Sequence, residues 1–316
     1  MKMYINAFGH YIPDGRVNNE YFKQLNGLDD DWIIQRTGIR TRSKIGDNED
    51  VMSMGIKAVE VAMEGLAYAI GDVDLIISAG YTITDTVGTL AHRVQREFNI
   101  MNAQVLAVTS ACSSFVNAIE IAEGYFATCK SQKALIICSE ANSVYNDYSN
   151  PKSGHLWGDG AVAVFVSKEK TEENQPQVLD IITKGLAYIG KGPDGVCLHP
   201  SNGGIAMNSG RDVFHYACLY MSSSMEELLQ RNGRRIEEVS HFACHQANMR
   251  IVANIAEHWH LPESKFFNNI HELGNTGSAS AMLALSQNSD KIKGGELVGL
   301  TVFGGGYSSG AMLIQF

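Results

Sequence analysis

Apolar residues occur along this chain in two alternating kinds of run. Short runs rich in aliphatic residues are typical of buried strands, and longer stretches repeat their apolar positions every three to four residues, as helices do. The short runs predict strands at residues 3–8, 74–78, 105–108, 134–138, 161–166, 178–183, 241–244, 297–303 and 311–314. The longer stretches predict helices at residues 50–69, 87–98, 113–128, 212–231, 249–258 and 278–286. This alternation indicates an α/β fold.

The two halves of the chain resemble each other. The strand at 73–78 has a counterpart at 239–244, the small-residue helix entry at 109–114 has one at 275–280, and the run 160–166 returns as 310–316. Three pairs in the same order, about 150 to 165 residues apart, favour a duplicated domain. The polar run 168–175 is the natural boundary, which predicts an N-terminal half over residues 1–170 and a C-terminal half over 171–316.

Composition narrows the class of protein. Of 316 residues, 45% are hydrophobic and only 6 are proline, which excludes a disordered chain. The net charge of −9 argues against an extended nucleic-acid surface. Because no window approaches a membrane span and the start lacks a signal-peptide core, we expect a cytoplasmic protein without membrane contact. The 6 cysteines form no CxxC pair, which favours free thiols over disulfides or a metal site.

Cys112 is a candidate nucleophile. It follows the apolar strand at 105–108 and opens the apolar helix at 113–128, among small neighbours that leave room for a substrate. A helix N-terminus favours a thiolate through its dipole and its unpaired N–H groups. A buried cytosolic cysteine is, however, often only a small hydrophobic residue, and the local sequence leaves that alternative open.

Three motifs in the second half carry further candidates. His245 follows the strand at 241–244 and is either a catalytic imidazole or a structural histidine in a turn. Asn275 precedes a helix and is either a polar site residue or an N-cap. The glycine run 304–306 ends a strand, where bare backbone N–H groups suit an oxyanion site or a tight hairpin. Residues 158–160 are expected to form another turn.

Taken in order, these motifs resemble the β-ketoacyl-[acyl-carrier-protein] synthase III family, whose members are condensing enzymes of the thiolase superfamily. The similarity spans essentially the whole chain. Its carriers are DWIIQRTGIR at 31–40, TSACS at 109–113, GDGA at 158–161, HQANMR at 245–250, GNT at 274–276 and FGGG at 303–306. The resemblance implies a thiolase-like duplicated five-layer αβαβα sandwich and a homodimer.

The resemblance also implies a reaction, the decarboxylative Claisen condensation that initiates fatty-acid synthesis. Cys112 would take an acyl group from an acyl-CoA primer, while the amides of Cys112 and Gly305 hold the oxyanion. Malonyl-acyl carrier protein would then bind, and His245 Nε2 and the Asn275 amide would stabilise the enolate that remains as CO₂ leaves. Decarboxylation produces the carbanion without a carboxylate base, and the family needs no cofactor or metal beyond its substrates.

Binding residues carry over from the family in the same way. Those that match its CoA contacts are Trp32, Arg36, Gly210, Phe214 and Asn248. Arg250 matches the carrier-protein contact, with Lys152 as a possible assistant, and these cations would receive an acidic partner. Solvated surface charge is the plain alternative for each cation. The stretch 185–210 is expected to shape the acyl entrance because loops of that length are often functional.

The chain departs from the family pattern at several positions. Cys112 is followed by Ser113-Ser114 instead of Ser-Gly, and Gly277 interrupts the small-residue run after Asn275. Val87 aligns with a bulky aromatic that in many members crosses the dimer interface and limits the acyl pocket. We therefore hypothesise that Val87 opens this pocket to longer or branched primers. Asp85 leaves a non-decarboxylative variant open, although a solvated turn is the simpler interpretation.

Two other classes of protein share part of this residue pattern. Papain-like proteases use Cys, His and Asn in the same chain order, but they lack the duplication and the C-terminal glycine run. A non-catalytic subunit on the thiolase fold would typically have lost the Cys or the His, and this chain keeps both. The alternative within the superfamily is a specialised acyltransferase or condensing enzyme of secondary metabolism, which would keep the same three residues.

Overall fold

A nine-stranded sheet runs through the computed structural model, which describes residues 2–316. The strand order is β11-β12-β13-β8-β1-β7-β6-β4-β5. The strands are β1 (Met3–Tyr11), β4 (Leu75–Ala79), β5 (Gln104–Val108), β6 (Lys133–Ala141), β7 (Asp159–Ser167), β8 (Gln177–Gly185), β11 (Val239–Cys244), β12 (Leu297–Gly304) and β13 (Ser308–Gln315). All nine strands that the sequence predicts are present, each within a few residues of its expected bounds.

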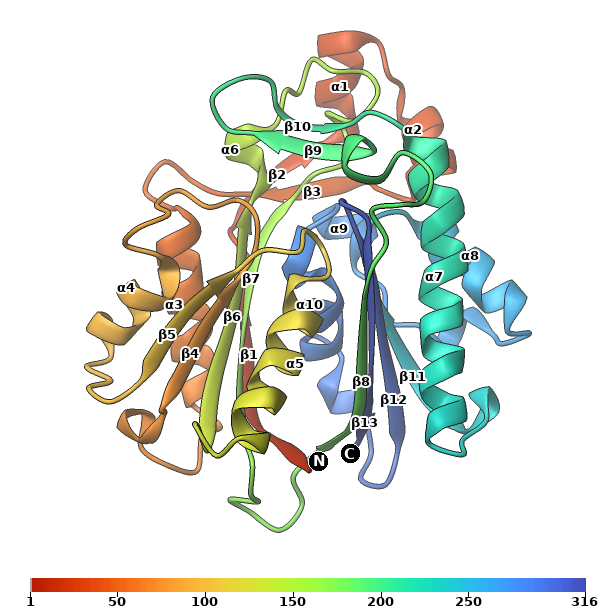
Figure 1. The fold of residues 1–316 in the computed structure, drawn as a ribbon. Coiled ribbons are helices and arrows are strands. Elements are labelled where there is room, and N and C mark those ends of the chain that lie inside the picture. Colours follow the sequence, from red (N-terminus) through yellow and green to blue (C-terminus); the bar gives the residue numbers. More distant parts are fainter. Residues whose placement is uncertain (1) are drawn as a thin grey trace.

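Helices divide this sheet into layers, and Figure 1 shows it as two arms with two helices between them. The helices in the middle are α5 (Ser114–Ala127) and α10 (Ser280–Ser286), and both contact strands of both arms. The outer face of the first arm is covered by α3 (Val51–Met63) and α4 (Leu90–Glu97), and that of the second by α7 (Gly210–Arg231) and α8 (Met249–His258). The result is the expected five-layer αβαβα sandwich.

The two arms repeat one strand pattern. In the first, β1 pairs with β7 and β7 with β6 in antiparallel fashion, and β6 pairs with β4 in parallel. In the second, β8 pairs with β13 and β13 with β12 in antiparallel fashion, and β12 pairs with β11 in parallel. This agreement supports a duplication, while the boundary between residues 170 and 171 stays a prediction.

Burial explains the different sequence patterns of the helices. Because α5 packs between the arms, it is apolar on more than one side, and Phe115, Ile119 and Phe126 are fully buried. The surface helix α4 buries only one stripe, formed by Leu90, Ala91 and Val94.

Shorter elements gather at one end of the sandwich, above the tips of the strands (Figure 1). These are β2 (Gly15–Asn18), α1 (Asn19–Asn26), α2 (Asp30–Thr37), β3 (Thr41–Lys44), α6 (Asn142–Tyr145), β9 (Val196–His199), β10 (Gly204–Met207) and α9 (Ile270–Leu273). The sequence patterns do not predict them. None of the helices within residues 2–316 combines the length and apolarity that a membrane crossing needs.

Residues 158–160 are not the turn that the sequence suggested. Asp159 and Gly160 begin the buried strand β7, and the Asp159 carboxylate accepts the N–H groups of Ile45 and Ser143, each at 2.8 Å. Gly158 is needed because a Cβ there would lie 1.8 Å from the Leu273 carbonyl oxygen. Close packing, rather than chain reversal, explains these glycines.

Candidate active site

Cys112 lies in a tight connection between β5 and α5. Ala111, just before it, has φ of +49°, a left-handed conformation that costs a non-glycine residue roughly 1–2 kcal/mol. The Ser114 hydroxyl closes this connection, because it accepts the Ser110 N–H at 2.8 Å and donates to the Ala111 carbonyl at 2.6 Å. Ser114, a departure from the family pattern, therefore holds the nucleophile segment in place.

The protonation state of Cys112 differs from the expected thiolate. Burial, with a smaller contribution from the nearby Glu140 carboxylate, raises the pKa of this thiol to about 12, and the Tyr81 hydroxyl opposes part of that rise. The side chain is 9% exposed. The thiolate that the sequence suggested is therefore not favoured at rest, because burial has the largest effect on the pKa of this thiol. The resting sulfur is a neutral thiol.

His245 directly follows β11. The ring nitrogen Nδ1 lies 2.5 Å from the Ser280 hydroxyl of α10, and the backbone N–H of His245 donates to the Thr301 carbonyl at 2.8 Å. Burial lowers the pKa of the imidazole to about 4, which makes it neutral at physiological pH. Ser280 was not identified from the sequence, because a serine in a small-residue helix start carries no distinguishing signal.

Hydrogen bonds of the backbone and the side chain fix Asn275. Its N–H donates to the Leu156 carbonyl at 2.8 Å, and its own carbonyl accepts the Gly158 N–H at 3.0 Å. The side-chain oxygen Oδ1 accepts the Gly277 N–H at 3.0 Å, which fixes the amide orientation and turns Nδ2 the other way. Thr276, not Asn275, is the N-cap of the following turn at Gly277–Ala279, although the Asn275 side chain makes the bond to the N–H two residues on that an N-cap would make.

The glycine run ends β12 beside the nucleophile. A Cβ on Gly304 would lie 2.8 Å from the Cys112 nitrogen and 3.0 Å from the Ser113 nitrogen, so only glycine allows this approach. Among residues 2–316, the amides of Cys112 and Gly305 donate to no backbone carbonyl. Both N–H groups are thus available to a bound oxyanion.

These residues meet in one cavity of about 250 Å³, which we call the thiol cavity. Cys112, His245, Asn275 and Gly305 all line it. Its mostly apolar remainder consists of Tyr81, Ala111, Trp157, Pro193, Val196, Cys197, Leu198, Ile205, Met207, Val213, Ala217, Ala247, Ile251, Phe303, Gly304 and Gly306. The stretch 185–210 supplies residues of β9 and β10 to this wall, and its role in shaping the acyl entrance stays a prediction.

A buried carboxyl group not identified from the sequence stands behind the thiol cavity. Glu140, at the end of β6, accepts the Thr82 N–H at 3.0 Å, the Thr82 hydroxyl at 2.6 Å and the Ser278 hydroxyl at 2.5 Å. Burial raises its pKa. Glu140 thereby ties the segment after β4 to the segment after Asn275.

None of the residues expected to bind CoA lines the thiol cavity, and they lie on or beside three helices. Trp32 and Arg36 are on α2, where the Arg36 guanidinium stacks 4.2 Å from the centre of the Trp32 ring. Gly210 begins α7, and Phe214 on the same helix lies 5.5 Å from the Arg250 guanidinium. Asn248 caps α8 by accepting the Arg250 N–H at 2.9 Å.

Both α7 and α8 also line the thiol cavity, through Val213, Ala217 and Ile251. The outer residues of these two helices, Phe214 and Arg250, therefore belong to elements that reach the nucleophile. Lys152 is exposed in the connection between α6 and β7. Its role beside Arg250 stays a prediction.

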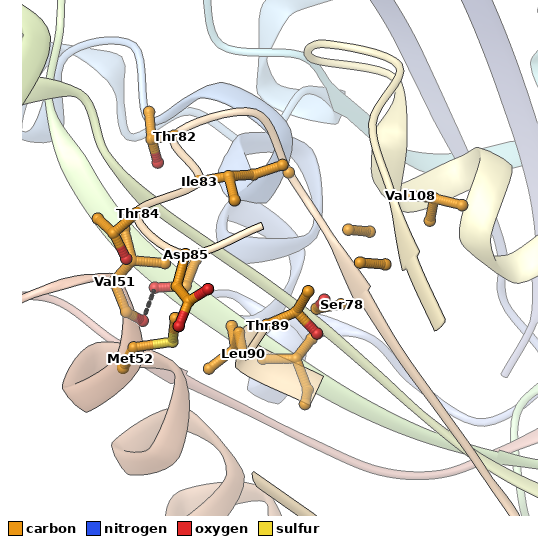
Figure 2. A pocket seen from close by; sticks show the side chains of 15 residues that line it. Val51, Met52, Ser78, Thr82, Ile83, Thr84, Asp85, Thr89, Leu90 and Val108 are labelled. Carbon is orange, nitrogen blue, oxygen red and sulfur yellow. Dashed lines mark hydrogen bonds between the residues drawn. The ribbon is translucent and has the colours of Figure 1, made fainter. Parts of the chain in front are cut away.

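A second cavity of about 40 Å³ lies behind the segment that follows β4 (Figure 2). Its mostly apolar wall includes Val51, Ile83, Leu90 and Val108, and the carboxylate of Asp85 lies at its edge. That carboxylate accepts the N–H groups of Val87 and Gly88 at 2.9 and 2.8 Å, which lowers its pKa and marks an exposed turn. Val87 itself is 84% exposed and lines neither cavity of its own chain.

The five-layer fold, with a cysteine, a histidine and an asparagine around one cavity, defines a protein of the thiolase-fold class. Two family models match it: 3-oxoacyl-[acyl-carrier-protein (ACP)] synthase III over residues 106–185 and the C-terminal part of 3-oxoacyl-[acyl-carrier-protein (ACP)] synthase III over residues 229–316. The chain belongs to the β-ketoacyl-[acyl-carrier-protein] synthase III family.

Similar proteins cover the whole chain. The β-ketoacyl-[acyl-carrier-protein] synthase III of Aquifex aeolicus is 31% identical over 310 residues, which are 98% of this chain and 97% of that protein. The enzyme of Ehrlichia ruminantium (strain Welgevonden) is 32% identical over 317 residues, with 98% of each chain covered. The crystal structure of 3-oxoacyl-[acyl-carrier-protein] synthase III from Aquifex aeolicus VF5 superposes with a TM-score of 0.92 at 30% identity, covering 99% of this chain and all of that one. The papain-like alternative is therefore excluded.

Proposed function

We propose that this protein catalyses the decarboxylative condensation of an acyl-CoA primer with malonyl-acyl carrier protein, through an acyl group carried on Cys112. The observation that supports this most directly is the shared cavity of Cys112, His245 and Asn275. The relatives from Aquifex aeolicus and Ehrlichia ruminantium are β-ketoacyl-[acyl-carrier-protein] synthases III, which also supports the proposal. The first condensation of fatty-acid synthesis is the corresponding role.

In the first half-reaction the Cys112 sulfur attacks the thioester carbonyl of the primer. The amides of Cys112 and Gly305 donate to the oxyanion, and each donor of this kind lowers a barrier by about 3 kcal/mol. As the new carbon–sulfur bond forms and the old one breaks, the proton of the neutral Cys112 thiol leaves with the CoA sulfur. No permanent thiolate is required.

In the second half-reaction two neutral donors stabilise an enolate. The Gln246 N–H donates to Ser280 Oγ at 3.4 Å, so the Ser280 proton is available to His245 Nδ1. The imidazole proton then resides on Nε2, directed to the substrate. Asn275 contributes Nδ2, because its Oδ1 already accepts the Gly277 N–H. The malonyl thioester loses CO₂, and its carbanion attacks the acyl carbon on Cys112. The bond between that carbon and the Cys112 sulfur breaks, the 3-oxoacyl thioester leaves on the carrier protein, and the sulfur takes up a proton from solvent to become a thiol again.

Substrate recognition would use the outer end of the thiol cavity. Trp32 and Arg36 would hold the adenine and a phosphate of CoA, with Gly210, Phe214 and Asn248 along the pantetheine arm. Arg250 and Lys152 would contact the acidic carrier protein. The acyl chain of the primer would lie in the acyl pocket. Val87 of a partner subunit would leave this pocket wider than a bulky aromatic residue does. The proposed chemistry needs no metal or further cofactor.

A cytoplasmic homodimer fits this function. The edge strand β5 pairs with β4 on one side only, and Gln104 and Ala107 are exposed along it. Two apolar side chains that precede β5 in the sequence are also exposed, Met101 at 76% and Val87 at 84%. An open, partly apolar strand edge next to exposed apolar side chains favours self-association.

Intact-mass spectrometry after mixing with a panel of acyl-CoAs tests the proposal. The expected result is one acyl adduct, mapped by peptide analysis to Cys112, which malonyl-acyl carrier protein discharges as a 3-oxoacyl product. Cys112→Ala should abolish capture, and Cys138→Ala should leave it intact because that buried cysteine lies outside the thiol cavity.

The role of His245 has its own test. His245→Ala should slow the discharge by malonyl-acyl carrier protein far more than the acyl capture, since the imidazole acts on the enolate. Equal losses in both steps would contradict this assignment.

The same panel of acyl-CoAs tests the proposed effect of Val87. Acetyl-CoA reacting much faster than every longer or branched primer would refute that effect.

A further inference from the structure

Tyr81 lines the thiol cavity and has no part in the reaction as derived above. It follows β4 and Gly80, in the segment that separates the two cavities: Tyr81 faces the thiol cavity, whereas its neighbours Gly80 and Thr82 line the second cavity. Its side chain interacts with the Cys112 thiol. Tyr81 and Cys112 therefore meet within the thiol cavity.

The Tyr81 hydroxyl is fixed by its surroundings. It donates to Asn142 Oδ1 at 2.9 Å. The orientation of Asn142 is set, because its Nδ2 donates to the carbonyls of Gly158 at 2.7 Å and Asn275 at 3.3 Å. One chain of polar contacts thus leads from the thiol through Tyr81 and Asn142 to the backbone of Asn275.

Gly277 explains how a tyrosine fits here. A Cβ at position 277 would lie 2.4 Å from the Tyr81 hydroxyl oxygen, and the φ of +59° also favours glycine. The Tyr81 backbone is held as well, since its N–H donates to the Glu140 carboxylate at 3.2 Å. Gly277, which interrupts the family's small-residue run, therefore leaves the space that the Tyr81 hydroxyl occupies.

We propose that Tyr81 is a positioning residue for the nucleophile: its hydroxyl orients the Cys112 sulfur and donates a hydrogen bond to it while the sulfur carries negative charge. The proposal rests on the proposed function of Cys112 as acyl acceptor. In the resting state the single hydroxyl proton lies toward Asn142, and the hydroxyl oxygen can accept the thiol proton. During attack the hydroxyl proton turns toward the sulfur and remains on Tyr81, while the thiol proton leaves with CoA.

Alkylation of Cys112 by iodoacetamide across a range of pH tests this without any acyl substrate. In Tyr81→Phe the pH midpoint of the alkylation rate should rise by about one unit, so the rate below the midpoint should fall about tenfold. The matched control is Tyr145→Phe, which removes a hydroxyl that donates to the Ile83 carbonyl at 3.1 Å, outside the thiol cavity. Its profile should match that of the unmodified chain.

An unchanged or lowered midpoint in Tyr81→Phe, with thermal unfolding intact, would overturn the proposal. Gly277→Ala provides a second route, because its Cβ displaces the hydroxyl: it should raise the midpoint alone and add little to Tyr81→Phe. Additive shifts would also overturn it. Failure of the proposed function is distinguishable, since it would show as absent acyl capture whatever the alkylation profile.

Discussion

His245 shows how much a single residue depends on burial. In solution an imidazole titrates near pH 6.5, and in this fold burial holds the pKa at about 4. Between these values the unfolded chain binds a proton that the folded chain excludes, so the folded state loses stability as the pH falls from about 6.5 toward 4. A histidine kept neutral in this way can donate from Nε2 throughout the physiological range.

This titration can be measured as a difference between two chains. From pH 7 to pH 5 the free energy of unfolding should fall by about 2 kcal/mol more in the unmodified chain than in His245→Gln. Denaturant titration at both pH values gives the comparison, which cancels the other buried groups. Parallel loss in the His245 variant would refute the buried neutral imidazole.

Sequence reasoning identified the reacting residues but not their state. Cys112, His245 and Asn275 stand in recognisable motifs, and all three line one cavity as expected. The rise in the Cys112 pKa could not be foreseen, because it depends on desolvation and on Glu140, which is 28 residues further along the chain. Tyr81 and Ser280 carry no local signal either, since only the packing of distant segments gives them polar partners.

At the scale of elements, the contact between β12 and the start of α5 positions the nucleophile. Gly304→Ala would force a Cβ against backbone nitrogens of this connection, and overpacking of this kind costs roughly 1–3 kcal/mol. We expect lower unfolding stability and a large loss of acyl capture. Chemical denaturation and timed intact-mass analysis measure the two effects.

Gly124→Ala is the matched control on the same helix. A Cβ at this exposed position of α5 meets nothing within 4 Å, so the helix should gain about 1 kcal/mol of stability without a change in acyl capture. If both alanine variants slowed capture alike, the role of Gly304 as a close-approach position would be wrong.

The elements that sequence patterns predicted are those with a consistent face. Most of the sheet strands are buried and therefore consist of apolar runs, and the edge strand β5, although partly exposed, is still apolar from Val105 to Val108. The hairpin of β9 and β10 was missed because each strand has only four residues, and glycine interrupts the segment. The prediction of a turn at 158–160 was wrong because glycine and aspartate usually mark turns. Asp159 is instead buried in a strand, where its carboxylate accepts three hydrogen bonds from Ile45 and Ser143.

At the scale of the whole molecule, the open edge of β5 determines the expected assembly. Ala107→Lys places a charge on this edge and should convert a dimer to a monomer, as measured by size-exclusion chromatography with light scattering. Leu219→Lys alters an apolar side chain on α7 that is 49% exposed, and it should leave the dimer intact. A persistent dimer in the Ala107 variant, or a monomer in the Leu219 variant, would place the interface elsewhere.

The position of β13 has a consequence for how the protein is made. This strand is the last of the sheet to be synthesised, yet it lies between β12 and β8 and follows the glycine run that lines the thiol cavity. On the ribosome, Cys112 therefore emerges long before the walls around it can close. The nascent chain carries a thiol whose surroundings are incomplete until the residues up to Gly306, which line the thiol cavity, have been synthesised.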